Sequence, residues 1–481
     1  MRICFMCDLH LPFDIDALQY KVLDWAIEDI RKNQVDCIAF VGDVTADGNG
    51  IVYKRFVEKM QGIGIPFLYI PGNSDLRDSC FYMENYQNAT ECTTVLDGVK
   101  IFAINDSDGN IPNEQLKYLE NADENSIVFM HHPISCISME ARTRFLEWKE
   151  KRKGVRVFFG HEHYASETAE WVSLQAMDPD KAIGENPCIT YYDTQTKVCR
   201  KSYYECKKPA DLPKYLGISC YRPVQDITLA IEKGLKNLEL RPNILAENEA
   251  EIASLIALWR KQGDTVLSIH LSEVSFDGNK VFAEENYEKL IRLGVALRAE
   301  RFVQHVPLVS VVAVKKNENS LKMIAEFIAE RLNSIPYTCV IGVENMHMTK
   351  NDQPNDNRRF GYTPEETLAF MRAVEAETKH KVGINFDIGH ARNNAPFSQK
   401  YQISTWFSML GEYIVSYHLH QVTIQDGVFQ NHMPITEVNG RLISYASFFK
   451  CWVDGQINKA PCIFEMRPEN SYDITLKTFQ F

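Results

Sequence analysis

The sequence lacks several features that would place it in a special class of protein. None of its apolar runs is long enough to cross a bilayer, and it has no low-complexity segment and no short repeat. An excess of basic charge is missing as well, because 52 Lys and Arg stand against 64 Asp and Glu and give a net charge of −12. A general nucleic-acid-binding surface is therefore not expected, although a local basic patch stays open.

Closely spaced cysteines, which bind zinc in many small domains, are also scarce. The 13 cysteines are scattered, and one close pair, Cys4 and Cys7, lies in a strand-like run, where we expect core packing. The odd number of cysteines indicates a reducing compartment. The amino terminus lacks the basic segment of a secretory leader, and the first candidate site residue is already Asp8. We therefore expect a cytoplasmic protein with no membrane attachment.

What the chain does contain is material for large cores, since 45% of its 481 residues are hydrophobic. Apolar runs alternate with segments of helical period along the whole length, which is typical of an α/β fold. In the first half, helices are predicted at 17–32 and 142–152. The predicted strands, of which the last two are antiparallel, are 2–7, 36–41, 66–70, 100–104, 126–130, 155–159, 188–192 and 198–204.

A polar stretch with two prolines, residues 206–213, is the best linker and separates a domain at 1–205 from one at 214–481. Beyond it, helix-like segments follow eight apolar runs: 215–220, 237–240, 265–271, 301–306, 339–344, 382–387, 414–420 and 461–465. Eight such units in about 270 residues match the count and length of a closed (β/α)₈ barrel. The second domain is therefore predicted to be a TIM barrel.

In the first half, polar residues directly follow the apolar strands. Because the carboxyl ends of neighbouring strands share one edge of an α/β sheet, these side chains should converge on one crevice. Carboxylates, imidazoles and an amide oxygen suit Mn, Fe, Zn or Co, and there are more ligands here than one ion requires, so two divalent ions are expected. The residues are Asp8, His10, Asp43, Asn73, Ser74, Asp75, His131, His132, His161 and His163.

The order of these motifs over about residues 1–205 resembles that of the calcineurin-like metallophosphoesterases. The matching segments are Asp8-Leu9-His10, Gly42-Asp43, Gly72-Asn73-Ser74-Asp75, His131-His132-Pro133 and Gly160-His161-Glu162-His163. The resemblance implies a four-layer αββα domain that hydrolyses a phosphate ester. Two ions about 3.5–4 Å apart can generate a hydroxide nucleophile at neutral pH and neutralise phosphoryl charge.

The resemblance also implies the role of each residue. Asp43, Asn73 and His131 are expected to be catalytic, while Ser74 and His132 would contact the substrate. The spacing leaves open whether His131 or His132 is the ligand, and the family pattern favours His131. One metal ion would be held by Asp8, His10, Asp43 and His163, and the other by Asp43, Asn73, His131 and His161.

One position departs from the family pattern. The third motif usually carries a histidine where this chain has Ser74, and that imidazole is thought to protonate the leaving oxygen or hold the phosphate. A serine cannot act as a general acid near neutral pH. We therefore expect a phosphoesterase that prefers easily expelled leaving groups or uses another acid. Phosphodiesters and phosphomonoesters both stay open as substrates.

In the second half, polar side chains stand at the ends of the last six predicted barrel strands, where the reactive groups of such barrels cluster. Burying them unpaired would cost on the order of several kcal/mol each, and a bound metal would offset that cost. These residues are His270, His305, Glu344, Asp387 with His390, His418 or His420, and Glu465, with His432 in the loop after the seventh strand.

Over about residues 213–481 these positions resemble the xylose-isomerase-like, apurinic-endonuclease-family-2 barrels. The epimerases among them use one ion, here implied to be held by Glu344, Asp387, His418 or His420, and Glu465, with the two glutamates as acid and base. The nuclease type uses three zinc ions, whose further ligands would be His270, His305, His390 and His432. In an epimerase-like barrel, His390 and His420 would contact the substrate. That nuclease has an aspartate where this chain has Gln430.

The sequence thus predicts a bifunctional metal-dependent enzyme. A dinuclear phosphoesterase would precede a barrel that holds one to three Zn or Mn ions and isomerises or epimerises a sugar-like molecule. The acidic charge weighs against DNA cleavage, which needs basic residues to displace counterions. A nucleic-acid repair enzyme and a barrel that only binds are the alternatives. The expected partner is a small phosphorylated or sugar-like substrate, and the sequence does not indicate an oligomeric state.

Overall fold

The computed structural model describes residues 1–78, 93–349, 351–469 and 471–479. They form two compact units. Unit 1 contains Met1–Lys207 together with Asn439–Ser447, and unit 2 contains Lys208–Val438 and Phe448–Phe481. Within unit 1, the Gly184 N–H donates to the carbonyl oxygen of Asn439 at 2.9 Å. A short segment from the second half of the chain is therefore part of the first unit, which nothing in the sequence had indicated.

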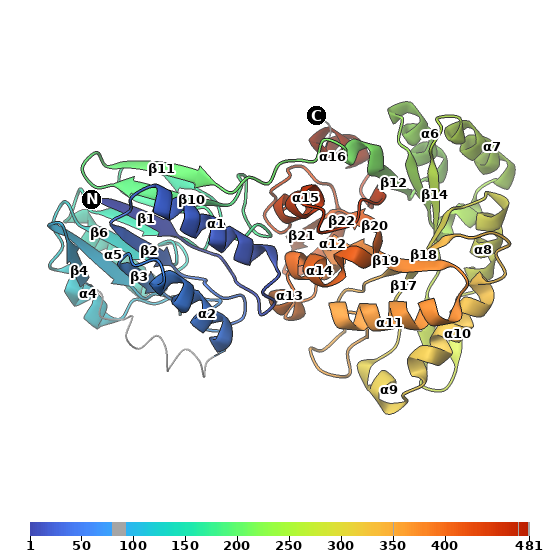
Figure 1. The fold of residues 1–481 in the computed structure, drawn as a ribbon, viewed down its shortest axis with the longest axis horizontal. Helices are drawn as coiled ribbons and strands as arrows, with labels where there is room; N and C mark the ends of the chain where they lie inside the picture. Colours follow the sequence, from blue (N-terminus) through green and yellow to red (C-terminus); the bar gives the residue numbers. More distant parts are fainter. Residues whose placement is uncertain (79–92, 350, 470, 480–481) are drawn as a thin grey trace. The chain divides into compact units, whose positions relative to one another are not determined.

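Unit 1 is built on two sheets (Figure 1). Its strands are β1 (Arg2–Met6), β2 (Cys37–Val41), β3 (Phe67–Ile70), β4 (Thr93–Leu96), β5 (Val99–Ile104), β6 (Ile127–Met130), β7 (Arg156–Phe159), β8 (Ser166–Glu167), β9 (Trp171–Ser173), β10 (Cys188–Asp193) and β11 (Val198–Tyr203). The five-stranded sheet has the order β11-β10-β1-β2-β3, and the six-stranded sheet has the order β4-β5-β6-β7-β9-β8. In the first sheet, β1, β2 and β3 are parallel, and β10 and β11 form the predicted antiparallel pair.

The two sheets share a core, and helices cover their outer faces. Phe5 of β1 stacks on Phe158 of β7 with the ring centroids 3.9 Å apart. Phe40 of β2 points the other way and contacts Phe56 on a helix, as the alternation of side chains along a strand requires. The helices are α1 (Leu18–Lys32), α2 (Gly50–Gln61), α4 (Asn113–Leu119) and α5 (Met139–Glu150). The predicted αββα arrangement is confirmed.

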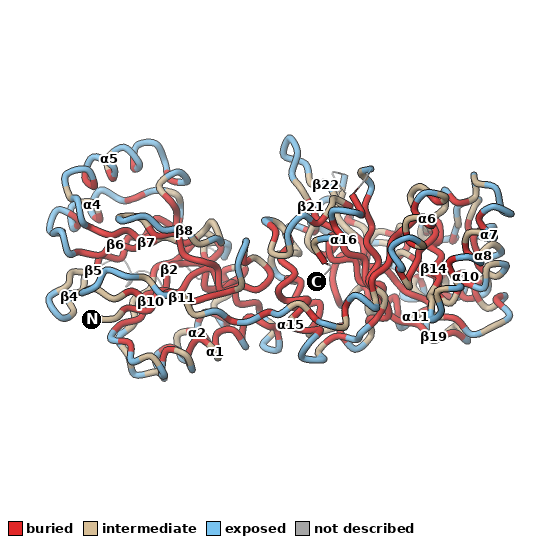
Figure 2. The backbone as a smooth tube through the Cα atoms, turned by 90° about the horizontal axis from the view of Figure 1, so that it is seen from above, coloured by how far each residue is buried: buried red, intermediate tan, exposed pale blue. Residues whose placement is uncertain are grey.

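Unit 2 is a closed barrel of eight parallel strands in chain order (Figure 1). Figure 2 shows these strands as buried, with exposed positions on the helices around them. The strands are β12 (Leu216–Cys220), β13 (Asn237–Leu240), β14 (Val266–His270), β17 (Arg301–His305), β18 (Val340–Glu344), β19 (Lys381–Asp387), β20 (Ile414–Leu419) and β23 (Cys462–Phe464). The predicted barrel is confirmed, with each strand within about two residues of its expected bounds.

A helix follows every barrel strand. These helices are α6 (Pro223–Lys233), α7 (Glu249–Arg260), α8 (Tyr287–Ala296), α10 (Ser320–Leu332), α11 (Pro364–Glu377), α14 (Ile403–Leu410), α15 (Ala446–Val453) and α16 (Ser471–Phe479). In the part of the chain that the structure describes, no helix is both long and apolar enough to span a membrane.

Several short elements of unit 2 were not predicted, because they hold too few residues to show a hydrophobic period. Four of them are strands that form two hairpins, one in the loop after β14 and one in the loop after β20. The second hairpin carries His432, which was expected in a loop. The elements are β15 (Val274–Phe276), β16 (Val281–Ala283), β21 (Gln421–Gln425), β22 (Val428–Met433), α9 (Val311–Lys316), α12 (Ile388–Arg392), α13 (Phe397–Lys400) and the 3₁₀ turns η2 (Leu212–Tyr215), η3 (Pro242–Ala246) and η4 (Gly411–Tyr413).

Candidate metal sites

Five site residues of unit 1 lie in sharp turns after β1, β2 and β7. Asp8, His10, Asp43, His161 and His163 all have positive φ, between 46° and 68°. This left-handed backbone is disfavoured for residues with a Cβ, and such strain is concentrated at functional sites. The turns bring the side chains of three strand ends toward one another.

Four of these residues form one compact group. The ligand atoms of Asp8, His10, Asp43 and His163 lie within 4.8 Å of one another. His10 Nε2 is 3.0 Å from Asp43 Oδ2, and His163 Nε2 is 3.4 Å from Asp8 Oδ1. The structure therefore brings together the set that the resemblance implies for the first metal ion.

A second group shares Asp43 with the first. The Oδ1 atom of Asn73 is 3.1 Å from His131 Nε2 and 2.8 Å from His161 Nδ1. His131 Nε2 is also 3.5 Å from Asp43 Oδ1. Asp43 thus directs one carboxylate oxygen toward each group, as a ligand shared by two ions would.

The two residues expected to contact the substrate differ in their placement. The ring of His132 lies 4.5 Å from that of His161, and its imidazole joins those of His131 and His161 in one group. Ser74 is buried, its hydroxyl donates to the carbonyl oxygen of Thr45, and its N–H donates to Asp43 Oδ1. Ser74 therefore supports Asp43, and His132 is the additional imidazole beside the ligands.

Burial and neighbouring charges oppose each other in this site. Burial raises the pKa of Asp43, but His131 and His10 outweigh it and hold that pKa well below its usual range. Burial lowers the pKa of His131, whereas Asp43 and Asp8 raise it, to about 9 overall. Burial and the charge of His131 lower the pKa of His161 to about 4. Asp43 therefore stays ionised at neutral pH, and His161 presents a neutral imidazole.

Two buried carboxylates that the sequence analysis missed support the site. Asp106 accepts the backbone N–H of His131 at 2.7 Å and that of His132 at 2.8 Å. Asp178 Oδ2 lies 3.5 Å from His10 Nδ1. Asp106 follows β5 closely, so the rule that identified the other strand-end residues would also have identified it. Asp178 lies in an irregular loop, where no such signal exists.

In unit 2, a first group lies at the ends of β14, β17 and β18. The ligand atoms of His270, His305 and Glu344 lie within 4.8 Å of one another. His305 Nε2 is 3.2 Å from Glu344 Oε1, and His270 Nε2 is 3.4 Å from Glu344 Oε2. One carboxylate therefore faces two imidazoles.

Glu344 also borders a carboxylate-rich centre of the barrel. His418 Nδ1 is 2.8 Å from Glu465 Oε2, 3.1 Å from Glu344 Oε2 and 3.8 Å from Asp387 Oδ2. These four residues are the set implied by the resemblance to single-ion epimerases. Of the two histidines left open by the sequence, His418 lies at this centre.

A third group consists of His390, His420 and His432. His420 Nε2 is 3.0 Å from Asp387 Oδ1, so this group adjoins the carboxylate-rich centre. Gln430, which occupies the position of the nuclease aspartate, is exposed on β22. His420 is thus the third imidazole of this group, and Gln430 is exposed to solvent.

Burial and ionic partners also oppose each other in the barrel. Burial raises the pKa of Glu344, but His418 and His305 outweigh it and keep that pKa well below its usual range. Burial also raises the pKa of Glu465, but the charges of Arg241 and His432 outweigh it and hold that pKa well below its usual range. The central carboxylates therefore stay ionised.

Three charged residues outside the predicted set hold candidate ligands in place. Glu239 Oε2 is 3.0 Å from His418 Nε2, and Glu273 Oε1 is 2.6 Å from His305 Nδ1. Arg241 Nη1 is 2.6 Å from Glu465 Oε1. Outer partners of this kind fix the orientation of metal-binding side chains. Glu239 and Arg241 lie at the end of the second barrel strand, so their position could have been read from the sequence.

The donor sets of both units fit divalent metal ions. Among the described residues, His390 Nε2 is a buried ligand atom that makes no hydrogen bond, and Asp8 Oδ1, His270 Nε2 and His432 Nδ1 face a charged partner only at 3.4 Å, which is long for a hydrogen bond. An unpaired buried polar atom costs about 1–3 kcal/mol, and coordination would remove that cost. The residues fit two ions in unit 1 and several in unit 2.

Comparison with known proteins matches each unit to a family. Residues 1–165 match the calcineurin-like phosphoesterase family, and residues 228–479 match the xylose isomerase-like TIM barrel family. A probable cyclic nucleotide phosphodiesterase of Xenorhabdus bovienii is 27% identical over 199 residues, which cover 34% of this chain and 78% of that protein. A probable glycerophosphodiester phosphodiesterase of Arcobacter nitrofigilis is 27% identical over 125 residues, covering 23% of this chain and 46% of that protein. The chain spans about half the length of three of the curated relatives that it matches.

Solved structures resemble each unit at low sequence identity. A putative xylose isomerase from Rhodospirillum rubrum has a TM-score of 0.41 and 13% identity, and the match covers 55% of this chain and 96% of that one. A dimetal phosphatase from Danio rerio has a TM-score of 0.32 and 10% identity, covering 40% of this chain and 92% of that one. By its family matches, the chain belongs to the xylose isomerase-like TIM barrel family through residues 228–479, with a calcineurin-like phosphoesterase domain over residues 1–165.

Proposed function

We propose that unit 1 is a metal-dependent phosphodiesterase that acts on a small phosphorylated molecule. The observation that carries this proposal is the position of Asp43, whose two carboxylate oxygens face two separate ligand groups. When bound, two divalent ions supply Lewis acidity toward the phosphoryl group and a nucleophile at neutral pH. The matched relatives are named as probable phosphodiesterases, which favours diesters over monoesters.

Residues of this chain would hold the ions and contact the substrate. Asp43 keeps its negative charge between the two ligand groups, and Asn73 offers its amide oxygen to the second group. The backbone N–H of His132 donates to the Asp106 carboxylate, and the ring of His132 lies beside that of His161. In that position His132 can contact a phosphate oxygen, which compensates for the imidazole that Ser74 lacks.

The test is hydrolysis of bis(p-nitrophenyl) phosphate by the full chain with Mn²⁺. Asp43→Asn is expected to abolish turnover, since it removes the shared charge. Asp24→Asn, which changes an exposed aspartate of α1, is the matched control and is expected to keep wild-type activity. Full activity in the Asp43→Asn variant would contradict the proposal.

For unit 2 we propose a polynuclear metal site that cleaves a phosphate ester, with sugar epimerisation as the competing reaction. A single-ion epimerase uses only the set of Glu344, Asp387, His418 and Glu465. Two further groups, one with His270 and His305 and one of three histidines, flank that centre. This surplus of imidazoles favours the reaction that uses more than one ion.

Metal content and product analysis separate these two reactions. Plasma mass spectrometry of the full chain is expected to show one ion fewer in His305→Ala and in His432→Ala than in the wild type. Cleavage of abasic duplex DNA or of a smaller phosphodiester that depends on His305 and His432 would support the proposal. An unchanged metal count in both variants, together with epimerisation of a ketohexose, would overturn it.

A further inference from the structure

The mouth of the barrel at the amino-terminal ends of its strands contains a hollow that the metal chemistry does not use. It has a volume of about 300 Å³ and lies at the starts of β17, β18, β19, β20 and β23. Three cations are among its lining residues, Arg301, Lys381 and Lys459, and the lining includes no acidic residue. A hollow of this size would hold several water molecules or a small anion.

Arg301 is the central group of this hollow. Its side chain is only 8% exposed, and within the described residues its Nε and Nη1 atoms make no hydrogen bond. The negative charges of Glu239 and Glu300 raise the pKa of Arg301 through electrostatic attraction. Glu300 is already paired with Arg260 at 2.8 Å. A buried guanidinium whose donors are unsatisfied is costly, and a bound anion would satisfy them.

Lys381 lies on the same side of the sheet as Arg301. Arg301 is in register with Val340, and Val340 is in register with Lys381, so the two cations stand two parallel strands apart. That separation is about 10 Å between backbones, which two long side chains can span from either side of an anion. Lys381 is exposed and forms no ion pair with any described residue, whereas Lys459 is paired with Asp211 at 2.5 Å.

We infer that this hollow binds a phosphate-type anion, either inorganic phosphate or the phosphate group of a small molecule, between Arg301 and Lys381. Guanidinium groups bind phosphate through two parallel N–H···O bonds, and an ammonium group adds a point charge. Burial lowers the pKa of Arg301 to about 10, which leaves the group cationic at neutral pH. The inference does not depend on either metal site.

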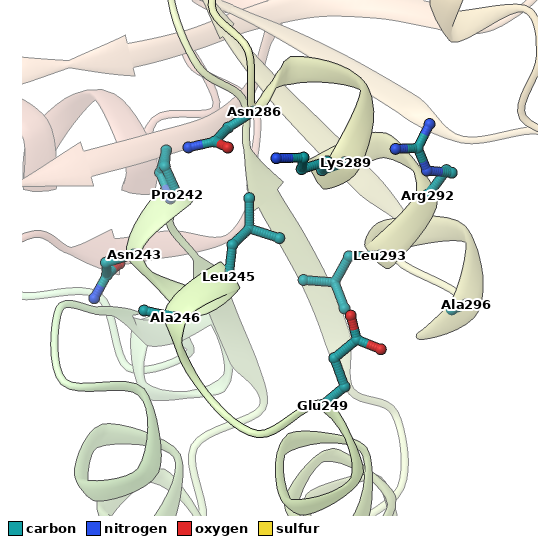
Figure 3. Close-up of a pocket in the computed structure, with 10 residues that line it drawn as sticks. All are labelled: Pro242, Asn243, Leu245, Ala246, Glu249, Asn286, Lys289, Arg292, Leu293 and Ala296. Atoms are coloured by element: carbon teal, nitrogen blue, oxygen red, sulfur yellow. The ribbon is translucent and has the colours of Figure 1, made fainter.

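A larger hollow on the barrel lacks these properties and provides a control. It measures about 770 Å³ and lies among η3, α7 and α8 (Figure 3). Its two cations already have partners, because Lys289 pairs with Glu285 at 3.1 Å and Arg292 with Glu288 at 3.9 Å. Lys289→Met is therefore a matched variant that should not affect phosphate binding.

The test is equilibrium dialysis of the full chain against radioactive inorganic phosphate at constant ionic strength. Arg301→Met is expected to bind one equivalent of phosphate fewer than the wild type, and Lys289→Met the same number as the wild type. Should Arg301→Met fail to fold, the exposed Lys381→Met carries the test, with an expected tenfold loss of affinity at one site. Wild-type stoichiometry and affinity in both variants would overturn the inference.

Competition identifies the source of the anion. If sn-glycerol 3-phosphate displaces phosphate from the Arg301-dependent site at a tenfold lower concentration than unlabelled phosphate does, the ligand is a phosphorylated small molecule. If unlabelled phosphate competes as well or better, the ligand is free phosphate. Equal displacement by chloride at the same concentration would contradict a phosphate site altogether.

Discussion

Asp106 offers a sharp test of how unit 1 positions its ligands. It lies outside both ligand groups, yet its two carboxylate oxygens accept the backbone N–H groups of His131 and His132 at 2.7 and 2.8 Å. Both histidines follow β6, so the carboxylate fixes the turn from which their rings reach the site. Asp106→Asn keeps the shape of the side chain but turns one acceptor into a donor.

This change should lower both the folding stability and the metal affinity. One of the two buried N–H groups loses its acceptor, which costs about 1–3 kcal/mol of folding stability. The turn that carries His131 should shift, and the loss of an outer-shell partner of this type reduces metal affinity or activity by about 10–100-fold. The free energy of unfolding and the kcat/KM value should therefore fall together.

The assays are urea unfolding, Mn²⁺ titration and hydrolysis of bis(p-nitrophenyl) phosphate. The control is Asp108→Asn on the same loop, where the exposed side chain accepts the nearby Asn110 N–H at 2.9 Å. Asp108→Asn should match the wild type in all three assays. If Asp106→Asn also matched the wild type in Mn²⁺ affinity and kcat/KM, the argument that Asp106 positions His131 would be refuted.

Three further predictions concern the barrel and the metals. In Gly389→Ala, the new Cβ would lie 1.9 Å from His420 Cε1, so the ring must move, and metal analysis should show one bound ion fewer; an unchanged count would contradict the third ligand group. Glu239→Gln removes the charge opposite His418 Nε2 and should weaken metal binding by unit 2 about 10–100-fold in a competition titration, and unaltered affinity would count against its orienting role. Removal of metals with EDTA should lower the melting temperature in calorimetry, because the clustered carboxylates lose the cations that stabilise them, and identical melting curves would show that the metals add no stability.

Much of the fold follows from short-range patterns in the sequence. The strand β19 is predicted at 382–387 and spans Lys381–Asp387, because a short, mostly apolar segment suits a strand that is buried on both faces, and residues 382–387 are all buried. Hairpins such as β21 and β22 were missed, since a few half-exposed residues in a long loop carry no clear period. The segment Asn439–Ser447 joins unit 1 through tertiary contacts, which no local pattern encodes.

The candidate sites were predictable to the extent that strand ends locate them. Asp8, Asp43 and His131 follow strands, and the structure brings their side chains together. Asp178 was missed because it follows β9, a strand of three residues that shows no hydrophobic period, and Glu239 because it lies within a predicted strand and not after its end. The roles of His418 and His420 depend on the side to which each ring turns, which sequence spacing alone leaves open.

Asp43 lies between two ligand groups of unit 1, where it would bridge two metal ions. Anomalous diffraction from crystals of the full chain grown with Mn²⁺, recorded above the manganese edge, tests it most directly. We expect two peaks about 3.5–4 Å apart, one on each side of the Asp43 carboxylate. A single peak, or two peaks that both lie away from Asp43, would contradict it.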